Sequence, residues 1–243
     1  LFYSSNVFSG TFISLITRFD VHQPFWLIDK ENAAASVILF TGGKGRIDIN
    51  ESGIGRGGNF LVRNREKFAR YSLNVAVIDA PTDQEKLFYF RTTEEHAADI
   101  KAVIKYMRDK YKKPVWLVGT SRGTTSVASV ASWLQGTDGP DGIVLTATIS
   151  RNGKKGESVN DVALKDINVP VLFVHNSDDE CKVCPPGAIG SIAEQMTNAK
   201  IKEIKFFSGG YTEGRKCGPQ SYHGFLGIED EVVQYIARWV KAH

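Results

Sequence analysis

The chain has 243 residues, of which 42% are hydrophobic and 23% are charged, and its formal net charge is +3. This length and composition are typical of a globular protein with a substantial core, and they exclude a disordered chain, a collagen and a small disulfide scaffold. The apolar runs are far too short to span a membrane, and the absence of a long basic stripe argues against nucleic acid as a partner.

Short apolar runs along the chain predict a sheet. Six runs rich in β-branched residues are each about one strand long, and most are apolar without alternation, as in strands that are covered on both faces of a parallel sheet. Ahead of them, residues 11–19 and 24–29 predict an entering hairpin at the sheet edge. The six predicted strands cover residues 36–41, 75–79, 114–119, 142–148, 169–175 and 201–207.

Segments with a helical period lie between these strands, and Thr92 with Glu95 forms a capping-box pattern at the start of one of them. Strands that alternate with helices predict a doubly wound, mostly parallel α/β sheet of about eight strands. No repeat, linker or long helical insertion suggests a separate lid, so we expect one domain over residues 1–243, with edge strands over 1–35 and the core over 36–243. The predicted helices cover residues 60–71, 94–111, 124–134, 188–197 and 231–242.

The strongest chemical signal is the motif Gly119-Thr-Ser121-Arg-Gly123. Gly-x-Ser-x-Gly alone occurs by chance in many proteins, but here a strand of the buried type precedes it and a helix of small residues follows it. A serine hydroxyl is a weak nucleophile, so it must be exposed on a sharp turn beside a base, where glycines allow the strand and the helix to pack closely. The motif therefore predicts Ser121 as a nucleophile.

A nucleophilic serine needs a histidine base, and the histidine needs a carboxylate. Among the five histidines, His223 lies in the loop between the last predicted strand and the last helix, from which it can reach a serine. His175 ends an apolar strand, so we expect a structural role for it. Asp178, Asp179 and Glu180 follow that strand directly, and the residues alone do not choose among these three acids.

Backbone donors for a developing oxyanion are expected at two places. The glycine-rich turn over residues 42–45 follows the first parallel strand, and its glycines let N–H groups approach a ligand closely. The backbone N–H of Arg122, directly after the serine, is the expected second donor.

Together these motifs resemble the α/β-hydrolase superfamily of serine esterases and lipases, and within it small bacterial hydrolases of undefined substrate. The resemblance extends from about residue 36 to the C-terminus. It is carried by Leu39-Phe-Thr-Gly-Gly43, Ile78-Asp-Ala-Pro-Thr-Asp83, Val118-Gly-Thr-Ser-Arg-Gly-Thr124, Asp178-Asp-Glu-Cys181, and Cys217 six residues before His223-Gly-Phe225.

The resemblance implies that the chain order is nucleophile, acid, base. It assigns the acid to Asp179, four residues after His175, with Asp178 as the alternative. It also implies Gly43 as the oxyanion donor and Lys44 as the second choice. The chain departs from the family pattern next to this donor, because Thr41-Gly42 stands where many relatives have His-Gly.

Two further motifs point to other chemistries. Residues 53–58 satisfy Gly-x-Gly-x-x-Gly, but about a dozen residues separate them from the nearest predicted strand, which argues against a dinucleotide site. Cys181 and Cys184 form a Cys-x-x-Cys pair, but a zinc site would need a second close pair and only Cys217 remains. We therefore expect neither a metal nor a cofactor.

The positions of the cysteines favour a structural bond instead. Cys181 follows the predicted acid and Cys217 precedes the predicted base, so a disulfide between them would tie the two loops together, with Cys184 unpaired and buried. Such a bond would imply an oxidising compartment, the periplasm or the exterior, with the cytoplasm as the alternative if the bond is absent.

The sequence thus predicts a serine hydrolase that cleaves a small or soluble acyl ester through an acyl-enzyme. A peptidase or amidase, or an acyltransferase, would use the same triad. A non-catalytic scaffold that binds a small molecule or a protein partner is the alternative from another class. Asp83 and Arg91 follow the second parallel strand, and each is expected either to contact the substrate or to pair within a surface loop.

Overall fold

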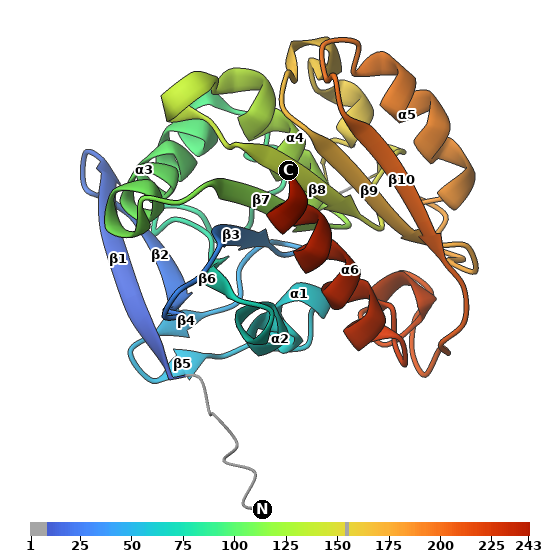
Figure 1. The fold of residues 1–243 in the computed structure, drawn as a ribbon, viewed down its shortest axis with the longest axis horizontal. Coiled ribbons are helices and arrows are strands. Elements are labelled where there is room, and N and C mark those ends of the chain that lie inside the picture. Colours follow the sequence, from blue (N-terminus) through green and yellow to red (C-terminus); the bar gives the residue numbers. More distant parts are fainter. Residues whose placement is uncertain (1–8, 154–155) are drawn as a thin grey trace, which may run out of the picture.

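A computed structural model describes residues 9–153 and 156–243 (Figure 1). These residues contain an eight-stranded sheet with the strand order β1-β2-β6-β3-β7-β8-β9-β10. β1 (Gly10–Arg18) pairs antiparallel with β2 (Val21–Ile28), which pairs antiparallel with β6 (Leu73–Ile78). The expected count of about eight strands and the entering hairpin at one edge are therefore confirmed.

The remaining strands of the sheet pair in parallel with their neighbours. Four of them, like β6, are buried along their whole length, because their Val, Ile and Leu side chains are covered on both faces. The last strand lies at the far edge and alternates exposed with half-buried residues. These parallel strands are β3 (Ala35–Phe40), β7 (Val115–Thr120), β8 (Gly142–Thr146), β9 (Val171–Asn176) and β10 (Lys202–Phe207).

Helices cover both faces of the sheet, as expected for a doubly wound fold. α3 (Glu94–Tyr111), α4 (Gly123–Trp133) and α5 (Ile189–Gln195) contribute to the hydrophobic core on one face. α1 (Phe60–Arg63), α2 (Arg65–Arg70) and α6 (Glu229–Ala242) contribute to the core on the other face, where α6 crosses the sheet (Figure 1). Because these strands are parallel, their carboxyl ends meet at one rim of the sheet, between the two helical layers.

Three local details differ from the expectations. The helix predicted over residues 60–71 is interrupted at Asn64, whose side-chain amide donates to the carbonyl of Phe60 at 2.8 Å and ends the first turn. The long helix α3 is capped by Thr93 rather than Thr92, because the Thr93 hydroxyl accepts from the N–H of His96. A small hairpin of β4 (Ile49–Asn50) and β5 (Gly53–Ile54) was not predicted.

No lid covers the rim in the described part of the chain. Between β8 and β9 the described residues form only the short 3-10 turns η2 (Val159–Asp161) and η3 (Leu164–Asp166) and irregular loop. The other 3-10 turns are η1 (Gly136–Asp138), η4 (Pro186–Ala188) and η5 (Tyr222–Gly224). None of the described helices is both long and apolar enough to cross a bilayer.

Candidate active site

Ser121 stands at a sharp turn between β7 and α4. Its φ is +53°, in the left-handed region that a non-glycine residue adopts at a cost, and its N–H is held by the carbonyl of Thr146 at 3.0 Å. A Cβ on Gly119 would lie 2.6 Å from the carbonyl oxygen of Gly123, and one on Gly123 would lie 2.2 Å from that of Phe40. Both glycines of the motif are therefore required by backbone packing, as expected for a nucleophile elbow.

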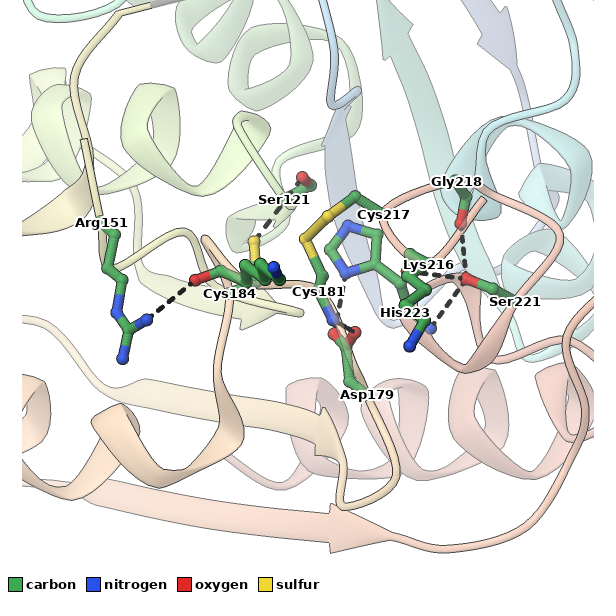
Figure 2. The surroundings of a disulfide bond; sticks show 11 residues. Ser121, Arg151, Asp179, Cys181, Cys184, Lys216, Cys217, Gly218, Ser221 and His223 are labelled. Atoms are coloured by element: carbon green, nitrogen blue, oxygen red, sulfur yellow. Dashed lines mark hydrogen bonds and ion pairs between the residues drawn. A yellow bond between two sulfur atoms is a disulfide. The ribbon is translucent and has the colours of Figure 1, made fainter. Parts of the chain in front are cut away.

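Asp179 and His223 come from separate loops and meet in the interior. Asp179 lies three residues after β9, and His223 lies in η5, between β10 and α6. Asp179 Oδ2 is 2.8 Å from His223 Nδ1, and the two side chains are 0% and 5% exposed (Figure 2). The other Asp179 oxygen accepts from the N–H of Cys181 at 2.9 Å, which fixes the orientation of the carboxylate.

The two acids beside Asp179 face elsewhere. Asp178 is exposed, and its Oδ2 accepts from the N–H of Gly209 at 3.1 Å. Glu180 forms an ion pair with Lys216 at 2.6 Å. Of the three consecutive acids, Asp179 alone contacts His223, so the structure favours Asp179 over Asp178 as the orienting acid.

Ser121 and His223 line one cavity of about 220 Å³ at the rim. Within the described residues no hydrogen bond joins them: the hydroxyl of Ser121 lies 3.9 Å from the sulfur of Cys184, and the buried Nε2 of His223 has no hydrogen-bond partner (Figure 2). Catalytic hydrogen bonds are often absent or long before substrate binds. This geometry is therefore compatible with a nucleophile and a base that come into contact when substrate binds.

The three cysteines lie around the same two loops. Cys181 is bonded to Cys217, as expected, and the bond links the Asp179 loop to the His223 loop (Figure 2). Cys184 is the unpaired, buried cysteine, also as expected. Burial raises the pKa of the Cys184 thiol to about 12, so the group stays protonated near neutral pH.

One group of side chains has the composition of a metal site. Donor atoms of Cys181, Cys184 and His223 lie within 4.8 Å of one another. The sulfur of Cys181 is bonded to Cys217, however, and metals bind cysteine as a free thiolate. While the disulfide is intact, this cluster does not offer a complete ligand set.

The glycine-rich turn after β3 lies against the elbow. A Cβ on Gly42 would lie 3.0 Å from the Cβ of Ser121, whereas Gly43, with φ of +61°, faces open space. The backbone N–H groups of Gly43 and Arg122 have no acceptor among the described residues. Gly43 lines the cavity beside Ser121 and Lys44 does not, so the geometry favours Gly43 as the oxyanion donor.

Arg91 supports this turn, a role that the sequence did not reveal. The side chain is buried, and its guanidinium donates to Ser126 Oγ at 2.7 Å and to the carbonyls of Thr41 at 3.2 Å and Gly43 at 3.4 Å. Burial lowers the pKa of Arg91 to about 9. A lone arginine in an aromatic loop carries no local signal of such a role.

Other polar residues at the rim are structural. Asp83 forms an ion pair with Arg18 at 2.9 Å. Asp79 is buried, and its two oxygens accept from the N–H groups of Ile47 and Ile49, each at 2.7 Å. His175 is buried and its Nε2 accepts from the N–H of Thr148 at 2.7 Å, which agrees with its expected structural role. Burial lowers the pKa of His175 to about 3, so the ring is neutral.

The second glycine motif lies in the small hairpin and the loop after it, and not directly after a strand of the main sheet. Gly53 belongs to the small hairpin, and a glycine loop then leads to Asn59 at the start of α1. Asn59 caps this helix by accepting from the N–H of Leu61 at 3.1 Å, and it also lines the cavity beside Ser121. Asn59 and Phe60, directly after the motif, therefore contribute to the wall of the candidate site.

Comparisons with protein families and with curated proteins find no match for this sequence. Solved structures do match. An α/β serine hydrolase homologue from Coxiella burnetii is 15% identical with a TM-score of 0.67, covering 97% of this chain and 100% of that chain. An esterase from Pyrococcus furiosus is 14% identical with a TM-score of 0.68, covering 97% of this chain and 93% of that chain.

A third similar structure is an α/β serine hydrolase without a lid from Xanthomonas campestris. It is 13% identical with a TM-score of 0.61, and the match covers 95% of each chain. Similarity over nearly the whole length at this level of identity shows the fold. The chain has the α/β-hydrolase fold, as its motifs predict.

Proposed function

We propose that this chain is a serine hydrolase that cleaves a small or soluble acyl ester. In this proposal Ser121 is the nucleophile, His223 the base and Asp179 the acid that orients it. The proposal is carried by the buried contact of 2.8 Å between Asp179 and His223, at the wall of the cavity that Ser121 also lines. The similarity in fold to serine hydrolases and an esterase supports hydrolysis in general.

The reaction begins with proton transfer to His223. Its Nδ1–H donates to Asp179, which leaves Nε2 able to accept the proton of the Ser121 hydroxyl. The serine oxygen attacks the ester carbonyl, and the N–H groups of Gly43 and Arg122, at the start of α4, stabilise the oxyanion. His223 returns the proton to the departing alcohol, and water activated by the same imidazole then releases the acid.

This cycle requires one rearrangement at the elbow. The Ser121 hydroxyl must turn from Cys184 toward Nε2 of His223, a rotation about a single side-chain bond. Cys184 stays protonated, so its thiol does not compete as a nucleophile. We infer that substrate binding brings the hydroxyl to the base.

The disulfide supports an oxidising compartment for this enzyme. Cys217 is exposed, so a reducing environment would have access to the bond that links the two loops. Disulfides of this kind persist mainly in the periplasm or outside the cell. We therefore propose the periplasm or the exterior as the place of action.

Hydrolysis of p-nitrophenyl esters tests the proposal. We expect the wild-type protein to hydrolyse an acetyl or butyryl ester, and Ser121→Ala to reduce kcat by about a thousandfold or more while leaving the thermal unfolding transition in place. Ser191→Ala, on the outer helix α5, is the matched control and should retain full activity. Equal activity in the two variants would refute Ser121 as the nucleophile.

A non-catalytic scaffold is the second candidate, and the contact between Ser121 and Cys184 is the observation that favours it. If this contact persists when ligands bind, the hydroxyl never reaches the base. A protein that folds, binds a small ester and does not turn it over would support this candidate.

A further inference from the structure

A second cavity adjoins Ser121 on a side that His223 does not line. It measures about 330 Å³ and shares Gly43, Ser121, Arg215 and Cys217 with the first cavity, whereas Arg122, Ile149 and Val183 line only the second. Because His223 must protonate the departing alcohol, the alcohol belongs on the side of the imidazole. The second cavity is then the place for the acyl group of the substrate.

Two arginines line this acyl cavity. Arg122 follows the nucleophile, and Arg215 comes from the loop that carries Cys217. The lining also includes Ile149 and Val183, which offer an apolar surface to a short carbon chain. The cavity thus combines a small apolar wall with two cationic side chains.

Neither arginine has a carboxylate partner within ion-pair distance in the described part of the chain. The guanidinium of Arg122 is half-buried and stacks over the ring of Phe88 at 5.7 Å. Glu157 attracts Arg122 only from a distance, and burial lowers the pKa of this arginine. The side chain of Arg215 is exposed and makes no hydrogen bond with the described residues.

Six of the twelve arginines form an ion pair with a carboxylate among the described residues, and the lysine next to Arg215 pairs with Glu180. The buried Arg91 beneath the oxyanion turn also lacks a carboxylate among the described residues, as do Arg70, Arg151 and Arg238, which do not line the cavities at Ser121. The arginines that form ion pairs with carboxylates are Arg18, Arg46, Arg56, Arg63, Arg65 and Arg108.

A cation that is partly removed from water gains more from an anionic ligand than a solvated one does. A guanidinium presents parallel N–H donors that match the two oxygens of a carboxylate. An acyl chain that starts at Ser121 and ends in a carboxylate would pack against the apolar residues of the cavity and pair with its arginines. A plain fatty acyl chain would leave the two arginines without a partner.

We propose that the preferred substrate is an ester of a short dicarboxylic acid, whose free carboxylate is bound by Arg122 and Arg215. This inference rests on the proposed hydrolase function and deepens it, since it assigns the acyl specificity of the same site. Both arginines act here as specificity determinants, and Arg122 additionally supplies its backbone N–H to the oxyanion.

A matched pair of esters tests the proposal. Mono-p-nitrophenyl adipate carries a terminal carboxylate, and p-nitrophenyl hexanoate has the same chain length without the charge. We expect kcat/KM to be at least about tenfold higher for the adipate ester at low salt, and this preference to shrink as the ionic strength rises. An equal or lower kcat/KM for the adipate ester would overturn the proposal while leaving the hydrolase function intact.

Substitutions then identify the residues. Arg215→Gln and Arg122→Gln should each lower the ratio of the two kcat/KM values by about tenfold, and Arg215→Glu should reverse the preference. Lys216→Gln is the control, because it removes a neighbouring positive charge that does not line the cavity. A ratio that is the same in Arg215→Gln, Lys216→Gln and wild type would contradict the assignment.

A binding measurement separates this inference from the hydrolase proposal. Calorimetric titration of adipate into Ser121→Ala requires no turnover, and we expect adipate to bind at least about tenfold more tightly than hexanoate. Equal binding of the two acids would overturn the inference. Absence of turnover for both esters, together with selective adipate binding, would instead refute the hydrolase and leave a carboxylate-binding site.

Discussion

The guanidinium of Arg91 donates to the carbonyl oxygen of Gly43 at 3.4 Å from a position that solvent does not reach. The same guanidinium bonds Ser126 on α4, so the glycine turn and the elbow helix are joined through one side chain. In the proposed mechanism Gly43 stabilises the oxyanion, which makes Arg91 a positioning residue that acts through the turn.

Replacement of Arg91 by methionine should therefore affect both folding and turnover. The carbonyls of Thr41 and Gly43 would lose their buried donor, and we expect a loss of about 2 kcal/mol in the free energy of unfolding. We also expect kcat to fall about tenfold with little change in KM, and Arg91→Lys to restore part of the rate. Urea denaturation and ester kinetics check this, with Arg70→Met on the surface of α2 as the control. An unchanged kcat in Arg91→Met would remove the positioning role.

Substitution of the two neighbouring aspartates should have very different effects on kcat. Asp179→Asn keeps the shape of the side chain but no longer holds the required tautomer of His223, so we expect kcat to fall by roughly a thousandfold or more. Asp178→Asn should retain activity within about threefold, because this carboxylate is exposed and, among the described residues, hydrogen-bonds only with Gly209. Steady-state kinetics of the two variants provides the comparison, and a larger loss in Asp178→Asn would transfer the role of the acid to that residue.

The disulfide should contribute to stability through the loop that it closes. The two cysteines are 36 residues apart, and closure of such a loop corresponds to roughly 3–4 kcal/mol in the chain-entropy treatment. We expect Cys217→Ser to lower the free energy of unfolding by up to that amount. Thiol titration of the denatured wild-type protein should find one free thiol, that of Cys184, and three free thiols would show that the bond is absent.

Stability should decrease at mildly acidic pH because of two buried histidines. Burial lowers the pKa of His96 and of His175 to about 3, whereas both rings titrate near 6.5 in the unfolded chain. Below pH 6.5 the two rings therefore bind protons in the unfolded state but stay neutral in the folded state. Stability is lost progressively as the pH falls toward 3. At pH 5 each ring should lower the free energy of unfolding by on the order of 1–2 kcal/mol relative to pH 7.5.

The variant His96→Leu isolates one of these two contributions. We expect its free energy of unfolding to fall less than that of wild type between pH 7.5 and pH 5, with the difference measured by urea denaturation at both values. The ring of His96 lies among Phe40 and Phe90, so leucine preserves the apolar contacts. An identical pH dependence in the variant and wild type would show that His96 is not the titrating group.

Features of the fold that depend on local sequence were predictable. The strands follow from apolar runs that are covered on both faces, and the elbow follows from Gly119 and Gly123, because no larger residue fits between the strand and the helix. One tertiary contact was also predictable, because Cys181 and Cys217 lie beside the expected acid and base in the sequence.

Other tertiary contacts of the site were not predictable from the residues. The direction in which Asp178 and Asp179 point is set by Gly209 and by His223, which lie far away in the sequence. The support that Arg91 gives to the glycine turn and the contact of Cys184 with Ser121 likewise join distant segments. No periodicity or local motif encodes such pairs.

Labelling with a fluorophosphonate probe tests the central claim most directly, because the probe reacts only with a serine that is activated by a base beside an oxyanion site. The account predicts one adduct, located on Ser121 by peptide mass spectrometry, absent in Ser121→Ala and strongly slowed in His223→Gln. A correctly folded protein that forms no adduct on Ser121, or that reacts equally fast without His223, would contradict it.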